Sequence, residues 1–208
     1  RLEYLDKPHL IDDLKYDLRI YVLVYGINPL RVYIHDAGLA RFATEPYTHP
    51  KASNLDNMFM HLTNYAKTKT TEHSNRIKAA AGETVGGVAE ESGEEESGHK
   101  RSLNAILKLL YEQGADADRI MDEIKDIIVK TMIVGQPYMS HIYRSCQPDD
   151  YDNSMCFQIL GFDIMIDKYF KPWLIEVNQS PSFATDSPLD YEVKKQVLRD
   201  SFKLLNIN

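Results

Sequence analysis

The chain has 208 residues, 43% hydrophobic and 26% charged, a composition typical of a globular protein with a sizeable core. Its formal net charge of −7 argues against a nucleic-acid-binding protein, and no apolar run is long enough to cross a membrane. Cys146 and Cys156 lack metal-ligand spacing and are expected to be free thiols in a reducing compartment. Because the first residue is Arg1 and no start methionine precedes it, we expect a part of a longer protein.

Two strands are predicted near the amino terminus. The first covers residues 15–25, and a turn over residues 26–29 leads into the second, over residues 30–35. Residues 36–38 are expected to end this strand, so that the following residues form a loop.

Charged side chains gather at the start of the first predicted strand. Lys15, Asp17 and Arg19 alternate with apolar residues and therefore share one face. With Arg41 nearby in the sequence, Lys15 and Arg19 form a basic cluster suited to phosphates or carboxylates. The alternative is that these charges are only solvated.

The next stretch is polar and then of low complexity. Thr63 and Asn64 could hydrogen-bond a small ligand, although their spacing alone favours a loop. Residues 79–98 are rich in alanine, glycine and glutamate and contain no aromatic residue. Such a segment cannot bury enough apolar surface to become ordered, which predicts a disordered acidic loop.

Three helices are predicted in the second half of the chain, over residues 100–112, over residues 118–132 and after Ser187. Pro137 is expected to break any continuation of the second. Ser187 is expected to cap the last helix, with Pro188 at its first position. The apolar stripe of that helix comprises Val193, Val197, Leu198, Phe202 and Leu205. Lys194 is expected, from spacing alone, to be exposed.

A β-hairpin is predicted between residues 156 and 178. Its strands are residues 156–166 and 172–177, joined by a four-residue loop. Symmetric pairing puts Asp167 opposite Pro172 and Asp163 opposite Glu176, and Asn178 shares the face of Glu176. Two facing carboxylates repel unless a cation lies between them. Few, hard oxygen ligands suit Mg²⁺, which takes further oxygens from phosphates. A solvated edge hairpin is the alternative.

Familiar site motifs give no further guidance. The sequence contains neither a P-loop nor a dinucleotide-binding glycine motif. No Ser/His/Asp arrangement can be placed, and the histidines show no ligand spacing.

Five segments in one order carry a resemblance to a known family: residues 15–24 (KYDLRIYVLV), 38–44 (GLARFAT), 61–65 (HLTNY), 161–163 (GFD) and 173–182 (WLIEVNQSPS). Together they resemble the tubulin tyrosine ligase-like family, specifically its polyglutamylase branch. The resemblance extends over nearly the whole chain except residues 66–98.

This resemblance implies an α+β architecture, the carboxy-terminal part of an ATP-grasp fold, with an antiparallel sheet flanked by helices and residues 1–208 in one domain. It implies an ATP- and Mg²⁺-dependent ligase that joins free glutamate to glutamate side chains of tubulin tails by an isopeptide bond, through an acyl phosphate. The implied partners are tubulin or microtubules and free glutamate, with neither nucleic acid nor membrane. The implied location is the cytoplasm and cytoskeleton, with the cilium or basal body as a site of action.

The resemblance also implies roles for individual residues. Arg19 and Arg41 are the implied catalytic residues. The implied Mg²⁺ ligands are Asp163, Glu176 and Asn178. The implied nucleotide contacts are Tyr4, Leu5, Lys15, Asp17, Arg19, Thr63, Asn64 and Asn178. The implied contacts to the incoming glutamate are Arg41, Tyr65, Lys100 and Lys194.

Some features depart from the family pattern or leave alternatives open. Leu2 stands where the family usually has glutamine, and the amino-terminal half of the ATP-grasp fold is absent from these 208 residues, so we do not expect them to be active alone. A catalytically silent microtubule or axoneme scaffold and a glycine or tyrosine ligase are the alternative functions. The acidic run over residues 90–96 could enter the acceptor channel in cis, although a solvated loop is favoured.

Overall fold

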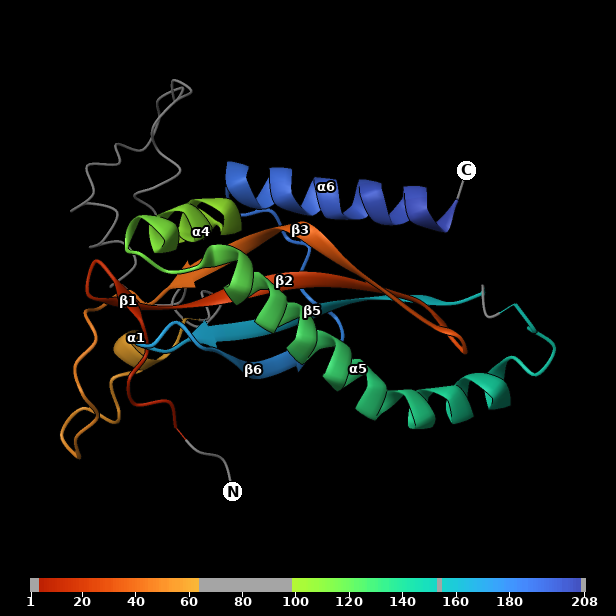
Figure 1. Ribbon diagram of the computed structural model, residues 1–208, viewed down its shortest axis with the longest axis horizontal. Coiled ribbons are helices and arrows are strands. Elements are labelled where there is room, and N and C mark those ends of the chain that lie inside the picture. Colours follow the sequence, from red (N-terminus) through yellow and green to blue (C-terminus); the bar gives the residue numbers. More distant parts are fainter. Residues whose placement is uncertain (1–3, 64–98, 153–154, 207–208) are drawn as a thin grey trace.

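The computed structural model describes residues 4–63, 99–152 and 155–206 (Figure 1). Asn64, Tyr65 and the predicted acidic loop over residues 79–98 lie outside the described residues. The strands are β1 Leu10–Ile11, β2 Leu14–Ile27, β3 Leu30–Phe42, β4 Lys100–Ser102, β5 Phe157–Ile166 and β6 Pro172–Asn178. The helices are α1 Met58–His61, α4 Leu103–Glu112, α5 Ala117–Cys146 and α6 Pro188–Leu205.

The strands form one antiparallel sheet in the order β4-β3-β2-β5-β6, with β1 paired to β2. Helices α4 and α5 pack on one face and α6 lies along the other (Figure 1). This arrangement confirms the predicted antiparallel sheet flanked by helices. The central strand, β2, is therefore covered on both faces.

Each face of the sheet has its own apolar core. Alternate residues of β2 meet α4 and α5, and the larger core includes Leu18, Ile20, Val22, Ile106, Ile124 and Ile128. The intervening residues of β2 meet α6, and the smaller core includes Tyr21, Leu23, Leu39, Ile159, Val193 and Val197. The smaller core covers only part of its face, because the charged start of β2 belongs to the same face.

Strand β3, which was predicted over residues 30–35, is longer than the sequence indicated. Residues 36–38 do not end it, because β3 continues to Phe42 and leaves only an irregularity between its pairings with Ile20 and Val22. Gly38 pairs with Ile20 at this point, and a Cβ there would lie 2.7 Å from the backbone oxygen of Arg19. The glycine therefore permits close strand contact rather than a turn. As a result, Arg41 lies on a strand and not in a loop.

The hairpin differs from its prediction by one residue near the loop. Ile166, not Asp167, pairs with Pro172, so the loop has one more residue than predicted. A register shift between Asp163 and Ile164 then restores the predicted pairing of Asp163 with Glu176. Asp167 instead accepts hydrogen bonds from the backbone N–H groups of Tyr169 and Lys171, at 2.8 and 3.1 Å, which explains why it belongs to the loop.

Two helix predictions need correction. Residues 100–102 form β4, with helix α4 starting after Ser102, whose side chain caps it. Pro137 does not break α5, which runs for 30 residues. The carbonyl that Pro137 leaves without an intrahelical donor belongs to Ile133, which is exposed, so water can satisfy it.

Helix α6 follows its prediction more closely. Ser187 is its N-cap and Pro188 its first residue. Val193, Val197 and Leu205 are buried and Leu198 is partly buried, as predicted. The prediction that Phe202 is buried is wrong, because Phe202 is 43% exposed, with its ring centroid 6.5 Å from that of Phe157. Lys194, expected at the surface, is buried.

Candidate functional site

A row of charged residues crosses the sheet on the face that α6 covers only in part. Strand pairing places Lys100 opposite Arg41, Arg41 opposite Asp17, and Arg19 opposite Asp163. Asp163 in turn lies opposite Glu176. Directly paired residues share a face, so five strands, β4, β3, β2, β5 and β6, each contribute to one site. The basic residues lie mainly toward β4 and the acidic ones toward β6.

Asp163 is the acceptor on which this row converges. Arg19 donates two hydrogen bonds to it, from Nε to Oδ1 at 2.5 Å and from a terminal guanidinium nitrogen to Oδ2 at 2.9 Å. Arg41 reaches Oδ2 at 2.8 Å, and the Asn178 amide nitrogen reaches it at 3.2 Å. Charge-assisted bidentate pairs of this kind fix orientation as well as supplying energy. The carboxylate of Asp163 is therefore held in one position.

Asp17 holds the other side of Arg41. The guanidinium donates from Nε to one Asp17 oxygen at 2.9 Å and from a terminal nitrogen to the other. Burial raises the pKa of Asp17, and the hydrogen bonds and charge of Arg41 oppose that rise. Burial lowers the pKa of Arg41, but its hydrogen bonds with Asp17 and the charges of Asp17 and Asp163 outweigh burial and raise it. Arg41 thus remains charged between two aspartates.

Gly161 makes room for Arg19. It pairs with Asn178 on β6 and with Tyr21 on β2. A Cβ at this position would lie 3.0 Å from Cδ of Arg19 and 3.1 Å from Cβ of Pro181. Because glycine has no Cβ, the arginine side chain can lie across the strand and reach Asp163.

The three predicted metal ligands come together, as the hairpin pattern indicated. Oδ1 of Asp163 accepts a hydrogen bond from Arg19 alone among the described residues, which leaves it a further lone pair. Glu176 is exposed, and Asn178 donates to Asp163 through its amide nitrogen, so its amide oxygen remains an acceptor. Within the described residues no three or more His, Cys, Asp or Glu side chains cluster as a metal site. Two carboxylates and one amide oxygen fit Mg²⁺, which uses few protein ligands.

A second group surrounds Lys15 at the start of β2. Its ammonium donates to the backbone oxygen of His61 at 3.1 Å and to the Tyr4 hydroxyl at 3.4 Å, and it lies 4.9 Å from the centre of the Tyr4 ring. The Tyr4 hydroxyl also meets Nδ1 of His61 at 2.8 Å. Burial lowers the pKa of Lys15, and the charge of Asp17 opposes this effect. Leu5 follows Tyr4 in the chain, so the predicted nucleotide contacts Tyr4, Leu5 and Lys15 lie together. Thr63, another predicted nucleotide contact, is partly buried and follows His61 by two residues.

The structure brings together two predicted glutamate contacts that are far apart in the sequence. The ammonium of Lys100 on β4 donates to Oδ2 of Asp190, and the ammonium of Lys194 lies 3.0 Å from Oδ1 of the same carboxylate. Burial raises the pKa of Asp190, but Lys100 and Lys194 outweigh burial and hold it below its usual range. Asp190 was missed in the sequence analysis. The signal that could have found it is its position three residues after the helix cap Ser187.

Comparison with known proteins identifies the family. The model described as the tubulin-tyrosine ligase family matches residues 2–208. The chain belongs to this family.

The curated relatives agree with the family match. The chain is 48% identical over 203 residues to a protein named probable beta-tubulin polyglutamylase from Tetrahymena thermophila, covering 98% of this chain and 16% of that protein. It is 46% identical to the mouse tubulin polyglutamylase TTLL6, over 98% of this chain and 23% of the relative. It is 42% identical to the human tubulin polyglutamylase TTLL7, over 99% of this chain and 22% of the relative. The chain thus spans less than a quarter of the length of these relatives.

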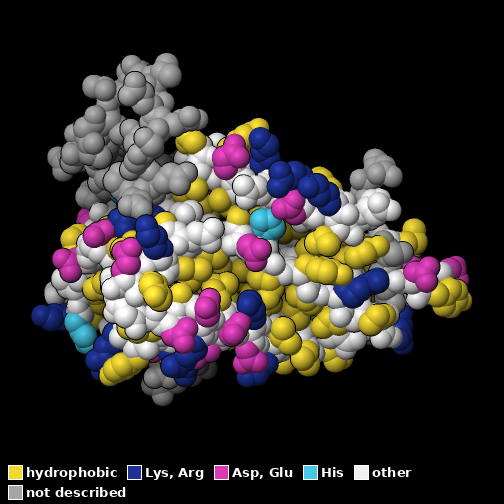
Figure 2. All heavy atoms as spheres, turned by 45° about the horizontal axis from the view of Figure 1, so that its top comes forward, with side chains coloured by type: hydrophobic (Ala, Val, Ile, Leu, Met, Phe, Trp, Pro, Cys, Tyr) yellow, Lys and Arg dark blue, Asp and Glu magenta, His cyan; other side chains and the backbone are white. Residues whose placement is uncertain are grey.

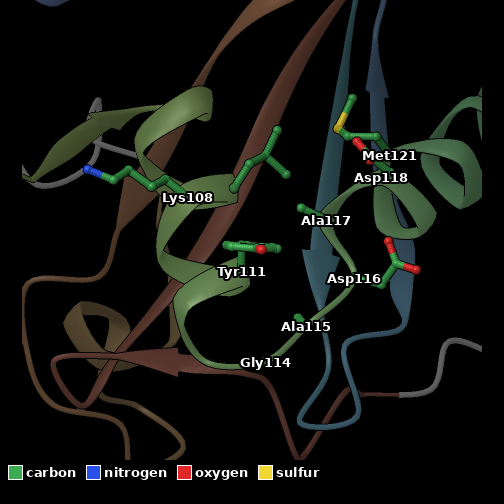
Figure 3. A pocket seen from close by; sticks show the side chains of 9 residues that line it. Lys108, Tyr111, Gly114, Ala115, Asp116, Ala117, Asp118 and Met121 are labelled. Carbon is green, nitrogen blue, oxygen red and sulfur yellow. The ribbon is translucent and has the colours of Figure 1, made fainter.

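A hollow on this tubulin-tyrosine ligase family chain lies away from the charged row. This hollow, between the end of α4 and the start of α5, is lined by Leu107, Lys108, Tyr111, Gly114, Ala115, Asp116, Ala117, Asp118 and Met121 (Figure 3). None of these residues belongs to the predicted site. Over the described parts of the chain, no helix has both the length and the apolar content to cross a membrane.

Proposed function

We propose that this chain carries the metal-binding and amino-acid-binding part of a tubulin polyglutamylase. Such an enzyme would use ATP to join free glutamate to glutamate side chains of tubulin tails. The names of the relatives, tubulin polyglutamylases from Tetrahymena thermophila, mouse and human, support this reaction. The family match over residues 2–208 supports the ligase class.

We further propose that residues 1–208 are the carboxy-terminal portion of one ATP-grasp domain. The antiparallel sheet, with helices on both faces and charged residues on one, supports this assignment. The remaining part of the domain would be supplied by the longer protein, so these 208 residues alone would be inactive.

One observation carries the functional proposal: two arginines are held among buried carboxylates on a single sheet face. Arg19 and Arg41 both bind Asp163, and Arg41 also binds Asp17. A buried ion-pair network of this kind adds little stability compared with apolar residues of the same size. Its presence in a central sheet is therefore better explained by chemistry on phosphates and carboxylates than by folding.

The residues divide into three roles under this proposal. Asp163, Glu176 and Asn178 would hold Mg²⁺, which when bound would spread the charge of the transferred phosphoryl group. The nucleotide would be bound by Tyr4, Leu5, Lys15, Asp17, Arg19, Thr63, Asn64 and Asn178. The free glutamate would be bound by Arg41, Tyr65, Lys100 and Lys194, because each of its two carboxylates needs a positive partner.

The proposed reaction has two steps. An oxygen of the acceptor carboxylate attacks the γ-phosphorus of ATP, and ADP leaves. The amine of free glutamate then attacks the carbonyl carbon of the acyl phosphate, and phosphate leaves as the isopeptide bond forms. Arg19 and Arg41 would stabilise the charge that develops on the phosphoryl group and on the carbonyl oxygen.

The experiment that tests this proposal measures labelled glutamate incorporation into microtubules by the full-length protein with ATP and Mg²⁺. We expect incorporation that is lost in Asp163→Asn and retained in Asp126→Asn, a matched change at an exposed residue on α5. Normal microtubule binding without incorporation would leave a scaffold protein instead. Preferred use of glycine or tyrosine over glutamate would replace the proposed substrate.

The proposed substrate also suggests a location. Relatives named for tubulin support an association with the cytoskeleton, and we propose the cilium or basal body as one place of action. Fluorescent full-length protein that stays away from microtubule structures in cells would contradict this proposal.

A further inference from the structure

The side chain of His61, at the end of α1, makes a hydrogen bond through each of its two ring nitrogens. Nδ1 lies 2.8 Å from the Tyr4 hydroxyl, and Nε2 lies 3.0 Å from the backbone oxygen of Asn54. A carbonyl oxygen can only accept, so Nε2 carries the proton and donates to Asn54. In the neutral ring Nδ1 is then an acceptor, and the Tyr4 hydroxyl donates to it. The two contacts therefore specify one tautomer of His61.

This hydrogen-bond chain continues to the ammonium of Lys15. Because the Tyr4 hydroxyl gives its proton to His61, its oxygen is an acceptor for Nζ of Lys15, at 3.4 Å. The backbone oxygen of His61 accepts a second hydrogen bond from Nζ, at 3.1 Å. Lys15 has no further hydrogen-bond partner among the described residues. Since an ammonium group has three N–H donors, one of them is left for a ligand.

The other end of the chain is anchored in a turn around Asn54. Its Oδ1 accepts from the backbone N–H of Lys51 at 2.7 Å, and its Nδ2 donates to the Thr48 hydroxyl oxygen at 3.0 Å. The backbone N–H of Asn54 also donates to the backbone oxygen of Lys51, at 2.9 Å. These contacts fix the Asn54 carbonyl. The hydrogen-bond chain from Asn54 through His61 and Tyr4 therefore restrains Lys15 relative to this turn.

The chain connects three segments that the proposed function assigns to the nucleotide. Tyr4 lies before β1, Lys15 lies on β2, and Thr63 follows His61 by two residues. These segments are separated in the sequence, and His61 is the residue whose side chain and backbone contact two of them. A change at His61 would therefore alter how the segments meet.

The ammonium of Lys15 is suited to bind an anion. Lys15 is 5% exposed, and its two acceptors, a carbonyl oxygen and a phenol oxygen, carry no charge. The charge of Asp17 acts on Lys15, but both carboxylate oxygens of Asp17 accept hydrogen bonds from Arg41. A buried ammonium is stabilised most by an anion that it contacts directly. A phosphate of a bound nucleotide would be such an anion.

We propose that His61 is a positioning residue for ATP, which holds the ammonium of Lys15, directly and through the Tyr4 hydroxyl, where it binds a phosphate. This inference rests on the proposed function and extends it by naming a residue that acts through Lys15. A free lysine side chain loses conformational entropy when it binds a phosphate, whereas a lysine that the protein already orients loses less. His61 therefore strengthens ATP binding by fixing Lys15 before the nucleotide arrives.

Binding of a non-hydrolysable ATP analogue to the full-length protein, measured by calorimetric titration, tests this inference. His61→Leu removes both ring hydrogen bonds, and we expect the Kd of the analogue to rise about tenfold. Lys15→Met removes the ammonium itself and should raise the Kd at least as much. In the double variant we expect a Kd within about twofold of that of Lys15→Met, because His61 acts through Lys15. Effects that multiply in the double variant would overturn the inference, since a merely structural role is independent of Lys15.

His61→Asn is the conservative variant, because its Oδ1 takes the place of Nδ1 and can accept from Tyr4. We expect its Kd to stay within about threefold of wild type. His49→Leu is the matched control. His49 lies on the same loop with its side chain 64% exposed, 3.5 Å from the Asp6 carboxylate, and we expect its loss to leave the Kd unchanged. Absence of rescue in His61→Asn, or an equal rise in His49→Leu and His61→Leu, would overturn the inference.

Tyr4→Phe serves if His61→Leu does not fold, because it keeps the ring and breaks the chain between the imidazole and Lys15. A several-fold rise in the Kd of the ATP analogue is expected, and an unchanged Kd would overturn the positioning role. The proposed reaction is judged separately: wild-type protein that binds the ATP analogue but does not incorporate glutamate would refute the polyglutamylase assignment and leave the role of His61 supported.

Discussion

One face of the sheet contains two regions of opposite character. Both are built from the same face of β2, β3 and β5 and both border α6. The charged region comprises Lys15, Asp17, Arg19, Arg41 and Asp163. The apolar region comprises Tyr21, Leu23, Leu39, Ile159, Val193 and Val197. The change occurs along β2 between Arg19 and Tyr21, without any break in the strand.

The difference separates residues that stabilise the fold from residues that are kept for chemistry. Burying an apolar side chain contributes about 1.5–3 kcal/mol, whereas a buried ion pair approximately balances its desolvation cost. The apolar region therefore attaches α6 to the sheet. The charged region depends on complete pairing, because each member that loses its partner becomes a buried, uncompensated charge.

The surface shows that the chain also presents apolar area elsewhere. Large apolar residues are exposed along α5, at Val129, Ile133, Val134, Tyr138 and Ile142. Hydrophobic side chains likewise cover wide areas of the face drawn in Figure 2, between scattered charges. The chain therefore has buried charged residues as well as exposed apolar ones, so burial alone does not distinguish the two regions of the sheet.

The largest expected effect comes from removing the shared cation of the charged region. Arg41→Met leaves Asp17 buried without its bidentate partner, so we expect a loss of about 3–5 kcal/mol in the free energy of unfolding. Urea denaturation measures this loss. Arg41→Lys, which keeps the charge without the fork, is the control and should lose less. A loss below about 1 kcal/mol in Arg41→Met would show that the network does not depend on pairing.

A core truncation in the apolar region should cost stability without changing the site. Leu23 is 4% exposed beneath α6, and Leu23→Ala should lower the free energy of unfolding by about 2–4 kcal/mol. Because Leu23 belongs to the apolar region, four residues along β2 from Arg19, we expect unchanged Kd values for ATP and glutamate in the folded full-length protein. A changed glutamate Kd would show that the two regions are coupled through α6.

Gly161→Ala tests the space that Arg19 requires. The new Cβ would press on Cδ of Arg19 and on Pro181, so we expect a loss of about 1–3 kcal/mol in stability and weaker ATP binding. Gly135→Ala on α5 is the matched control, because its Cβ would meet only the flexible end of Met139. That change should stabilise by about 0.5–1 kcal/mol. Equal effects of the two substitutions would refute the role assigned to Gly161.

Asp167 lies on the same hairpin as Asp163, and no arginine among the described residues binds its carboxylate. Burial raises its pKa, but the Trp173 indole at 2.9 Å and the backbone N–H groups of Lys171 and Tyr169 outweigh burial and lower it. A depressed pKa in the folded state adds stability above the ordinary aspartate value, near pH 4, that is lost as the pH falls through the folded value.

Asp167→Asn should therefore cost about 1–2 kcal/mol at pH 7 and reduce the fall in stability below about pH 4. Denaturation midpoints measured from pH 7 to pH 3 test this expectation. An unchanged pH profile would mean that the hydrogen bonds do not favour the ionised form.

The smallest effect is expected at an exposed ion pair. Lys130 and Asp126 meet across one turn of α5 with both side chains more than half exposed. Lys130→Gln should change the free energy of unfolding by less than about 0.5 kcal/mol. A larger loss in the same denaturation assay would show that charge pairs on this chain act outside the buried network as well.

Patterns over short stretches predicted much of the site. The hairpin pattern gave the pairing of Asp163 with Glu176, and alternation along β2 gave the shared face of Lys15, Asp17 and Arg19. The resemblance implied that Lys100 and Lys194 contact the incoming glutamate, which stays a prediction. The length of the hairpin loop was predicted one residue too short, because the apolar pattern does not reveal a register shift of one residue.

The sequence by itself determined the alternation of strands, the helix cap at Ser187 and the acidic hairpin pair, because each depends on residues close in the chain. Only the tertiary structure decided that Arg41 sits on a strand between two aspartates and that Asp190 joins Lys100 to Lys194. These contacts connect residues up to 122 positions apart, and a buried charge gives no periodic signal of which distant partner neutralises it.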